Sequence, residues 1–145
     1  MANSLYTLAK EGFLAGEIDM NTATIKSALV RGYTPNLTSH KFVSDVTGAG
    51  GTLVATSSAM TGISVTAGVF DATDVTFSTV AAGAAIPYIL LFQSSAVGGG
   101  GDVASSAQRV IALFDTTTGV TFPVTPNGGD IIIQWDSGAN KIFKL

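Results

Sequence analysis

The stretch VTFPVTPNGGDIIIQWDSGANKIFKL, residues 120–145, decides the fold class of this chain. Apolar segments alternate in it with turn residues, a pattern that predicts three strands separated by two turns. The turns fall at 127–129 (NGG) and 137–140 (SGAN), where asparagine and glycine favour the backbone conformations that hairpins need. Because the last residues read as a strand, we expect the carboxy-terminal segment to belong to a sheet.

The central part of this stretch also predicts which side chains face the core. Side chains alternate between the two faces of a strand, so Ile131, Ile133 and Trp135 share one face, opposite Ile132 and Gln134. We expect Trp135 to pack in the core, since the two isoleucines on its face favour burial. An exposed Trp135 would instead be a candidate interface anchor.

Further strands are expected upstream, bounded by glycine, proline and aspartate. The segment 86–93 (IPYILLFQ) is continuously apolar, as in a strand covered on both faces, and 109–115 is its expected neighbour. Residues 69–70 are predicted to pair with 75–80 across a turn at 71–74. Shorter strands are expected at 24–30, 53–56 and 63–65.

Eight or so short strands with regular turns indicate a mainly β fold, either an antiparallel β-sandwich or a jelly-roll-like arrangement. One short amino-terminal helix is expected within residues 1–17, with Asn3 or Ser4 as its cap and Gly16 as its end. Its apolar face follows a spacing of three and four residues: Leu5, Leu8, Ala9 and Phe13. The segment 37–46 fits either a helical turn or an irregular loop.

The length of 145 residues predicts a single β-rich domain, 1–145, that buries about 70% of the surface of its unfolded chain. Charged residues make up 12% of the chain, about half the usual share, and threonine, serine and glycine must supply much of the polar surface. A surface with few charges loses little free energy when a partner covers it. The composition therefore favours obligate assembly.

The charge pattern argues against nucleic-acid binding, because the formal charge is −3 and the seven basic residues are scattered singly. The absence of cysteine removes disulfides and thiolate metal sites from consideration. No secretory signal is recognisable at the amino end, so we expect synthesis in the cytoplasm. The longest apolar run, 80–92, is too short for a bilayer, and we expect no membrane span.

The segment 94–107 contains Gly98, Gly99, Gly100 and Gly101 among serines and alanines. This composition cannot form a core, so the segment is predicted to be a flexible loop or to be ordered only by a partner. A phosphate cradle is disfavoured, because no Gly-Lys-Ser or Gly-Lys-Thr follows the glycines.

The sequence offers no recognisable catalytic machinery. His40 is the single histidine, no serine lies in a G-x-S-x-G elbow, and we expect His40 to be an ordinary solvated residue. Calcium is the one realistic ion, with Asp71 and Asp74 or Asp130 and Asp136 as ligands, but aspartates in turns usually bond their own backbone. We expect no enzyme activity, no cofactor and no metal.

Several motifs resemble a known family. The carboxy-terminal TPNGGDI (125–131), the W-D pair at 135–136 and GANKIFKL (138–145) are its most distinctive features. The opening helix followed by G-E-I-D (16–19), the strand TIKSALV (24–30) and D-V-T-F (74–77) extend the similarity over most of the chain. In these segments the chain resembles small tailed-bacteriophage virion proteins of the capsid decoration, or cement, type.

The resemblance implies a β-rich protein that binds the outside of an icosahedral head, as a homo-oligomer such as a dimer or trimer. Its partner would be the major capsid protein, and it would stabilise the contacts between capsid subunits. It would be made in the host bacterial cytoplasm. The contact segments we expect are the amino-terminal helix, the glycine-rich loop and the carboxy-terminal strand. The candidate interface residues in them are Leu5, Phe13, Gly98, Gly99, Gly100, Gly101, Phe143 and Leu145.

Two alternatives remain open. A structural component of the phage tail or neck could share this composition and would be present in few copies per virion. A carbohydrate-binding β-sandwich should display an exposed aromatic platform, for which one tryptophan and three tyrosines offer little material.

Overall fold

The middle layer of the molecule is a five-stranded antiparallel sheet. In the computed structural model, which describes residues 2–145, its order is β1-β8-β7-β2-β3. The strands are β1 (Ser4–Leu5), β2 (Ile25–Arg31), β3 (Thr52–Thr56), β7 (Tyr88–Gln93) and β8 (Arg109–Phe114). Every residue of β8 and all but the first of β7 are buried, which confirms the prediction of a strand covered on both faces.

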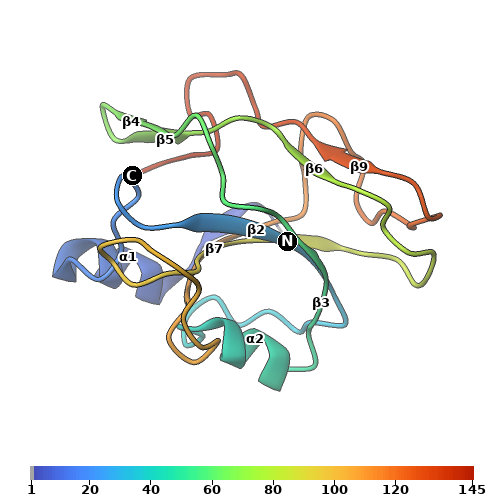
Figure 1. Ribbon diagram of the computed structural model, residues 1–145, viewed down its shortest axis with the longest axis horizontal. Coiled ribbons are helices and arrows are strands. Elements are labelled where there is room, and N and C mark those ends of the chain that lie inside the picture. The colour runs from blue at the N-terminus through green and yellow to red at the C-terminus, as the bar shows by residue number, and fades with distance from the viewer. Residues whose placement is uncertain (1) are drawn as a thin grey trace.

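The upper layer consists of short strands that lie over one face of this sheet (Figure 1). Three of them, β4 (Ser64–Thr66), β5 (Val69–Asp71) and β10 (Phe143–Lys144), form a sheet of order β10-β5-β4. The other two, β6 (Val75–Phe77) and β9 (Ile131–Ile133), pair with each other. The fold is therefore mainly β and antiparallel, with 31% strand and 10% helix, and no closed barrel forms.

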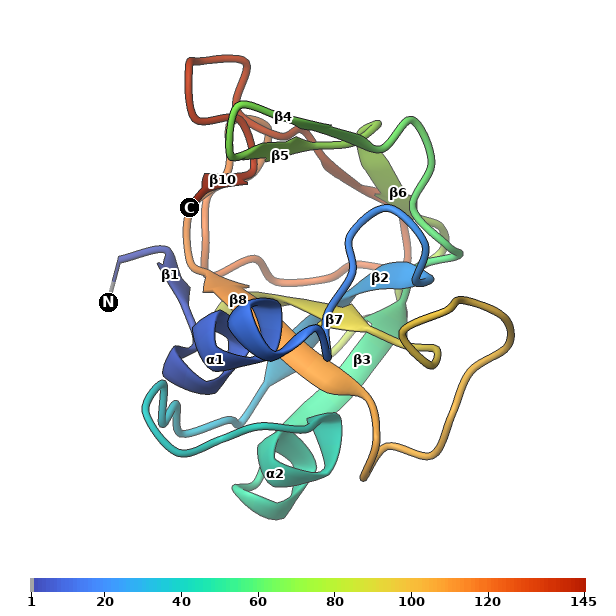
Figure 2. The same cartoon turned by 90° about the vertical axis from the view of Figure 1, so that its left-hand side faces the viewer.

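Two short helices lie on the other side of the five-stranded sheet from the short strands, as Figure 2 shows from the side. Helix α1 (Thr7–Ala15) ends at Gly16, whose φ of 73° is the left-handed conformation that glycine adopts without strain. Helix α2 (Val43–Gly48) forms in the segment that the sequence left ambiguous. The carboxylate of Asp45 accepts hydrogen bonds from the backbone N–H groups of Lys41 and Phe42, which fixes the start of α2.

The start of the amino-terminal helix differs from the prediction. Asn3 and Ser4 do not cap α1; the residue before the helix is Tyr6, and Ser4 with Leu5 forms strand β1 against β8. The amide of Asn3 instead holds the chain just beyond β8, since its Oδ1 accepts from the N–H groups of Asp115 and Thr116. Pairing with a long buried strand outweighs the local capping preference here.

The predicted hairpin between 69–70 and 75–80 is wrong. Strand β5 pairs with β4 on one side and β10 on the other, whereas β6 pairs with β9. The reason lies in the connection of β4 and β5, where Ala67 and Gly68 both have positive φ, as a two-residue hairpin turn requires. Both edges of β5 are thereby occupied by other strands.

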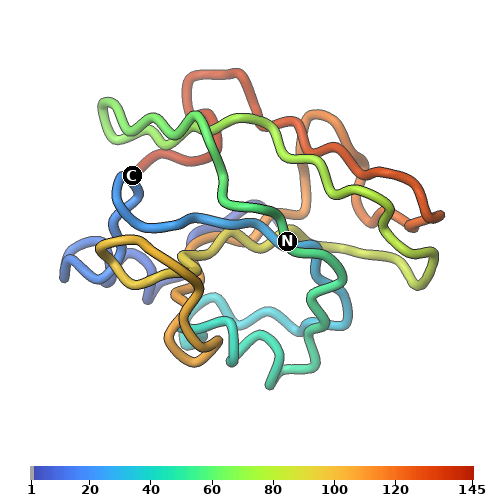
Figure 3. The backbone as a smooth tube through the Cα atoms, in the orientation of Figure 1, coloured from blue at the N-terminus to red at the C-terminus, as the bar shows by residue number. Residues whose placement is uncertain are grey.

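The carboxy-terminal stretch also pairs differently from the prediction. Residues 120–124 form no strand and contribute one isolated bridge, between Val124 and Ile86. Strands β9 and β10 are not a hairpin, although the Oδ1 atoms of Asn127 and Asp136 accept the turn hydrogen bonds their positions suggest. Figure 3 traces the chain from β9 across the upper layer to the carboxy terminus beside α1.

The predicted facing of side chains in β9 is confirmed. Ile131, Ile133 and Trp135 are buried, with Trp135 7% exposed, and Ile132 is half exposed. The ring of Trp135 lies 5.6 Å from that of Phe114 in β8. Trp135 therefore joins the upper layer to the five-stranded sheet and is not an exposed interface anchor.

Candidate interface at the terminal groove

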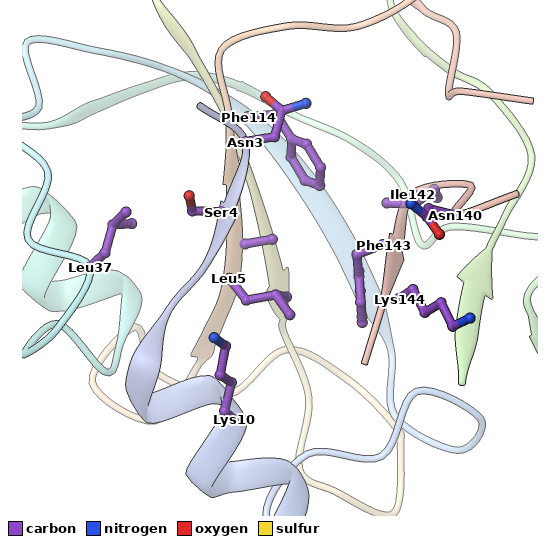
Figure 4. Close-up of a pocket in the computed structure, with 11 residues that line it drawn as sticks. Asn3, Ser4, Leu5, Lys10, Leu37, Phe114, Asn140, Ile142, Phe143 and Lys144 are labelled. Carbon is purple, nitrogen blue, oxygen red and sulfur yellow. The ribbon is translucent and has the colours of Figure 1, made fainter. Parts of the chain in front are cut away.

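A groove of about 510 Å³ lies between β1, the first turns of α1 and β10. We call it the terminal groove, because its walls come from both ends of the chain: Leu5 and Lys10 on one side, Phe143 and Lys144 on the other, with Phe114 between them. Figure 4 shows the side chain of Leu5 directed toward Phe143, and Lys10 rising from α1 below Leu5, on the side away from Phe143. Residues far apart in the sequence thus share one surface feature.

Pairing with long or central strands positions both walls. Ser4 and Leu5 pair with Leu113 and Ala112 of β8, and the Tyr6 N–H donates to the Ile111 carbonyl at 3.0 Å. On the opposite wall, β10 pairs with β5, and the Leu145 N–H donates to the Gly68 carbonyl at 2.9 Å. Strand pairing therefore holds both walls, and Leu37 and Asn140 from turns complete the lining.

Aromatic contacts hold β10 against α1. The ring of Phe143 stacks on that of Phe70 at 5.3 Å and lies 6.1 Å from the ring of Phe13. Phe70 is buried, whereas Phe13 and Phe143 are partly exposed. The sequence-predicted residues Phe13 and Phe143 therefore lie in contact, and of the two only Phe143 lines the terminal groove.

Exposed apolar side chains lie next to Phe13. A second hollow, of about 410 Å³, is lined by Leu5, Lys10, Phe13, Leu14, Lys144 and Leu145. Leu14 is 91% exposed and Leu145 is 59% exposed, high values for such large apolar side chains. Four of the predicted interface residues, Leu5, Phe13, Phe143 and Leu145, thus lie around one surface that includes the terminal groove.

The four glycines of the predicted interface lie elsewhere. Gly98, Gly99, Gly100 and Gly101 line neither hollow, although their neighbour Val97 lines a further hollow together with Phe13 and Leu145. Contacts within the chain hold the glycine segment. Thr24 Oγ1 donates to the Gly100 carbonyl at 2.9 Å, and Lys26 pairs with Asp102 at 2.7 Å.

These contacts change the interpretation of residues 94–107. Thr22 Oγ1 also donates to the Val97 carbonyl, and Ser94 and Ser95 at the start of the segment are buried. The sequence argument considered only whether the segment could form a core of its own. Polar groups of Thr22, Thr24 and Lys26, just before and at the start of β2, order it instead, so order through a partner is not required to explain its conformation.

His40 is not the ordinary solvated residue that the sequence suggested. Its Nδ1 lies 2.7 Å from the Tyr33 hydroxyl, which lies 3.0 Å from the hydroxyl of the fully buried Tyr6. Burial, reinforced by the bond to Tyr33, raises the pKa of Tyr6 far above its usual range. The phenol of Tyr6 therefore stays protonated, and this chain of hydrogen bonds links the start of α1 to the segment after β2.

The aspartates considered for calcium each have a partner within the chain. Asp71 lies 3.8 Å from the Lys141 ammonium, Asp74 accepts from the backbone N–H of Trp135, and Asp130 accepts from the backbone N–H of Thr79. Within residues 2–145, no three histidine, cysteine, aspartate or glutamate residues are grouped so that they could hold a metal ion. The turn aspartates bond backbone groups, as their residue type favours.

One polar cluster escaped the sequence analysis. Arg109, at the start of β8, is 4% exposed; its Nη1 pairs with Glu17 at 2.6 Å and its Nη2 donates to the Leu8 carbonyl at 2.6 Å. These contacts fasten both ends of α1 to the sheet and so position Lys10 and Phe13. The only signal in the sequence is an arginine at the beginning of an otherwise apolar strand.

Comparison of the chain with protein-family models, with curated proteins and with solved structures finds no match. Over residues 2–145, neither helix is long and apolar enough to cross a lipid bilayer.

Proposed function

We propose that this chain is a non-enzymatic structural virion protein that binds the outer surface of a phage capsid and stabilises contacts between major capsid protein subunits. The observation that carries the proposal is the convergence of Leu5, Phe13, Phe143 and Leu145 on one surface at the terminal groove. These residues come from two of the three segments expected to make contacts. The sequence resemblance supplies the identity of the partner.

The character of this surface supports a binding role. Large apolar side chains such as Leu14 and Leu145 are exposed next to a groove, a combination that marks interaction sites on protein surfaces. Covering them removes apolar area from water, and the few charges of the chain add little desolvation cost. Repetition of one such contact over a capsid lattice, or within a homodimer or homotrimer, would raise the overall affinity by avidity.

A carbohydrate-binding role receives less support. Among residues 2–145, the exposed large apolar side chains are aliphatic: Leu14, Val65, Val97, Ile132 and Leu145. Trp135, Tyr6 and Tyr33 are buried, so they offer no platform for a sugar ring. A tail or neck component remains the alternative, because it would use the same kind of surface at a lower copy number.

The experiment that tests the proposal is the copy number of this protein relative to the major capsid protein in purified virions, measured by quantitative mass spectrometry. A ratio near one, or a fixed simple fraction of one, is the expected result. A few copies per particle would favour the tail or neck alternative. Absence from the virion would overturn the structural proposal.

Substitutions at the exposed apolar positions then test the surface itself. Leu14→Asp combined with Leu145→Asp should lower the occupancy on capsids while leaving the fold intact, since both side chains are largely exposed. Ile132→Asp is the matched control, because Ile132 is also an exposed aliphatic residue but lies on β9, away from α1 (Figure 1). Equal occupancy for all three proteins would exclude this surface as the capsid contact.

A further inference from the structure

The terminal groove lies beside an open strand edge. In the sheet β10-β5-β4, β10 is the outermost strand, and within the described chain its only strand neighbour is β5. The Leu145 N–H donates to the Gly68 carbonyl, and successive residues of an antiparallel strand point their backbone groups to opposite sides. The N–H and C=O of Lys144 therefore point away from β5.

The upper layer ends at β10 on this side of the molecule. Among residues 2–145, no further strand pairs with β10 beyond the sheet β10-β5-β4. The terminal groove occupies the space beyond it, and its floor includes Ala112 and Phe114 of β8 and Leu5 of β1. One more strand on β10 would lie in this groove, opposite β8 and β1 (Figure 4).

The charges around the groove select the kind of strand. Lys10 and Lys144 line both hollows, and no aspartate or glutamate side chain of residues 2–145 does so, although the whole chain carries a net charge of −3. The faces of β10 are distinct as well. Phe143 packs on the buried Phe70, and Lys144, the next residue along the strand, is exposed.

We propose that the terminal groove binds an extended segment of another protein, added as a strand to the free edge of β10, in which apolar and acidic residues alternate. The apolar residues face Leu5 and Phe143, and the acidic residues face Lys144, with Lys10 at the end of the groove. Strand addition of this kind gains affinity from main-chain hydrogen bonds and specificity from alternate side chains. The inference rests on the proposed function in one respect, that the segment belongs to a virion protein.

A second copy of the chain is a poorer occupant. Antiparallel pairing of β10 with the β10 of another molecule would bring the two Lys144 side chains opposite or diagonal to each other. Like charges at such cross-strand positions are destabilising. Lys144 therefore disfavours self-association through this edge and favours an acidic partner.

The test uses the full chain and a fluorescein-labelled peptide of alternating valine and aspartate, VDVDVDV, with binding followed by fluorescence anisotropy. Saturable binding is expected, and a VKVKVKV peptide should not bind. Lys144→Ala should weaken binding about fivefold through loss of one exposed charge pair. Lys41→Ala, a lysine outside the groove, is the control and should leave the affinity unchanged.

Lys144→Pro separates the contribution of the main-chain hydrogen bond to peptide binding from that of the lysine charge. Both Lys144→Pro and Lys144→Ala remove the ammonium group, but only proline also removes the outward N–H, and proline is tolerated on an edge strand. Lys144→Pro should therefore bind about two- to tenfold more weakly than Lys144→Ala. Thermal unfolding of both variants checks that the fold is retained.

Amide hydrogen exchange on the unmodified protein provides a readout that needs no variant. The Lys144 N–H should exchange more slowly when the VDVDVDV peptide is bound, because the added strand accepts its hydrogen bond. Equal affinities for the two peptides, or equal exchange of Lys144 with and without VDVDVDV, would overturn the inference. Peptide binding by a protein that is absent from virions would overturn the proposed function alone, whereas an abundant virion protein that ignores the peptide would overturn only this inference.

Discussion

The five-stranded sheet and the upper layer are both held by antiparallel strand pairing, but the sequence predicts the pairing of the first better than that of the second. Strands β7 and β8 are six residues each, are almost wholly buried and are paired with each other, as their long apolar sequences predict. The upper strands are two or three residues long and, apart from the β4–β5 hairpin, their partners lie far away in the sequence. A long apolar run predicts both a strand and its position between two covering layers, whereas a short run predicts a strand but not its partner.

The largest expected loss of stability comes from a substitution at the centre of the five-stranded sheet. Leu90 in β7 is fully buried, so Leu90→Ala should lower the free energy of unfolding by about 4 kcal/mol through lost burial and the cavity left behind. Equilibrium unfolding in urea measures the change. The control is Leu14→Ala, at a 91% exposed position, which should change stability by less than about 0.5 kcal/mol. Similar losses for both variants would contradict this description of the core.

A smaller effect is expected from the upper layer. Phe143 is partly exposed and contacts Phe13 and Phe70, so Phe143→Ala should cost about 2 kcal/mol, roughly half of a fully buried phenylalanine. Hydrogen exchange would locate the loss. The Leu145 N–H, which bonds Gly68, should exchange faster while the amides of β7 keep their relative protection. A uniform loss of protection would mean that the two layers unfold as one unit.

The turn between β4 and β5 tests why the upper layer pairs as it does. Gly68 has a φ of 77°, and a Cβ added there would lie 3.1 Å from the Leu145 carbonyl oxygen, so Gly68→Ala should cost about 1 kcal/mol. Gly98→Ala is the matched control, because nothing lies within 4 Å of an added Cβ and its φ is not positive. If Gly98→Ala were the more damaging change, the conformation of the turn would not be what directs β5 to β4 and β10.

The smallest effect concerns the attachment of the glycine-rich segment to β2. A hydrogen bond from Lys26, followed in importance by one from Ser94, lowers the pKa of Asp102 below its ordinary value of 3.8. A lowered pKa contributes stability that is present above the ordinary value and is lost as the pH falls through the folded-state pKa. Asp102→Asn should therefore slightly flatten the decline of stability below about pH 4.

Because the Asp102 side chain is half exposed, solvent screening keeps this contribution well below 1 kcal/mol. Urea midpoints measured between neutral and acid pH would detect it. Lys26→Met should flatten the curve in the same way, since it removes the other partner. A steeper acid decline in either variant would contradict the assigned sign.

The sequence predicts fold class well, because period-two alternation and apolar runs report burial directly. The strands at β2, β7 and β8, the end of α1 at Gly16 and the burial of Trp135 are confirmed on this basis. Pairing of short strands is not encoded locally, so β5 was assigned to the wrong neighbour. Its true partners are selected by a two-residue turn and by aromatic contacts between distant segments.

For the candidate interface, the sequence indicated which segments could make contacts, but not which of their residues lie together on one surface. Leu5, Phe13, Phe143 and Leu145 converge because β1 and β10 both pair with strands of the sandwich, a relation that no local pattern contains. The glycines at 98–101 were chosen for their composition, and polar contacts with Thr22, Thr24 and Lys26 hold their segment elsewhere. Arg109 was missed, because a buried arginine reveals its role only through its partners.

The contacts of Asn3 have a consequence for how the chain acquires its fold during synthesis. Its amide donates a hydrogen bond to the backbone carbonyl of Thr116, 113 residues later in the chain. Strand β5 likewise pairs with β10, which is synthesised much later. Contacts of such high order slow folding, because the loops must close before the contacts form. While the ribosome is still making β8 and β10, the nascent β2 and β7 expose their apolar faces, so these faces stay uncovered until their partners have been synthesised.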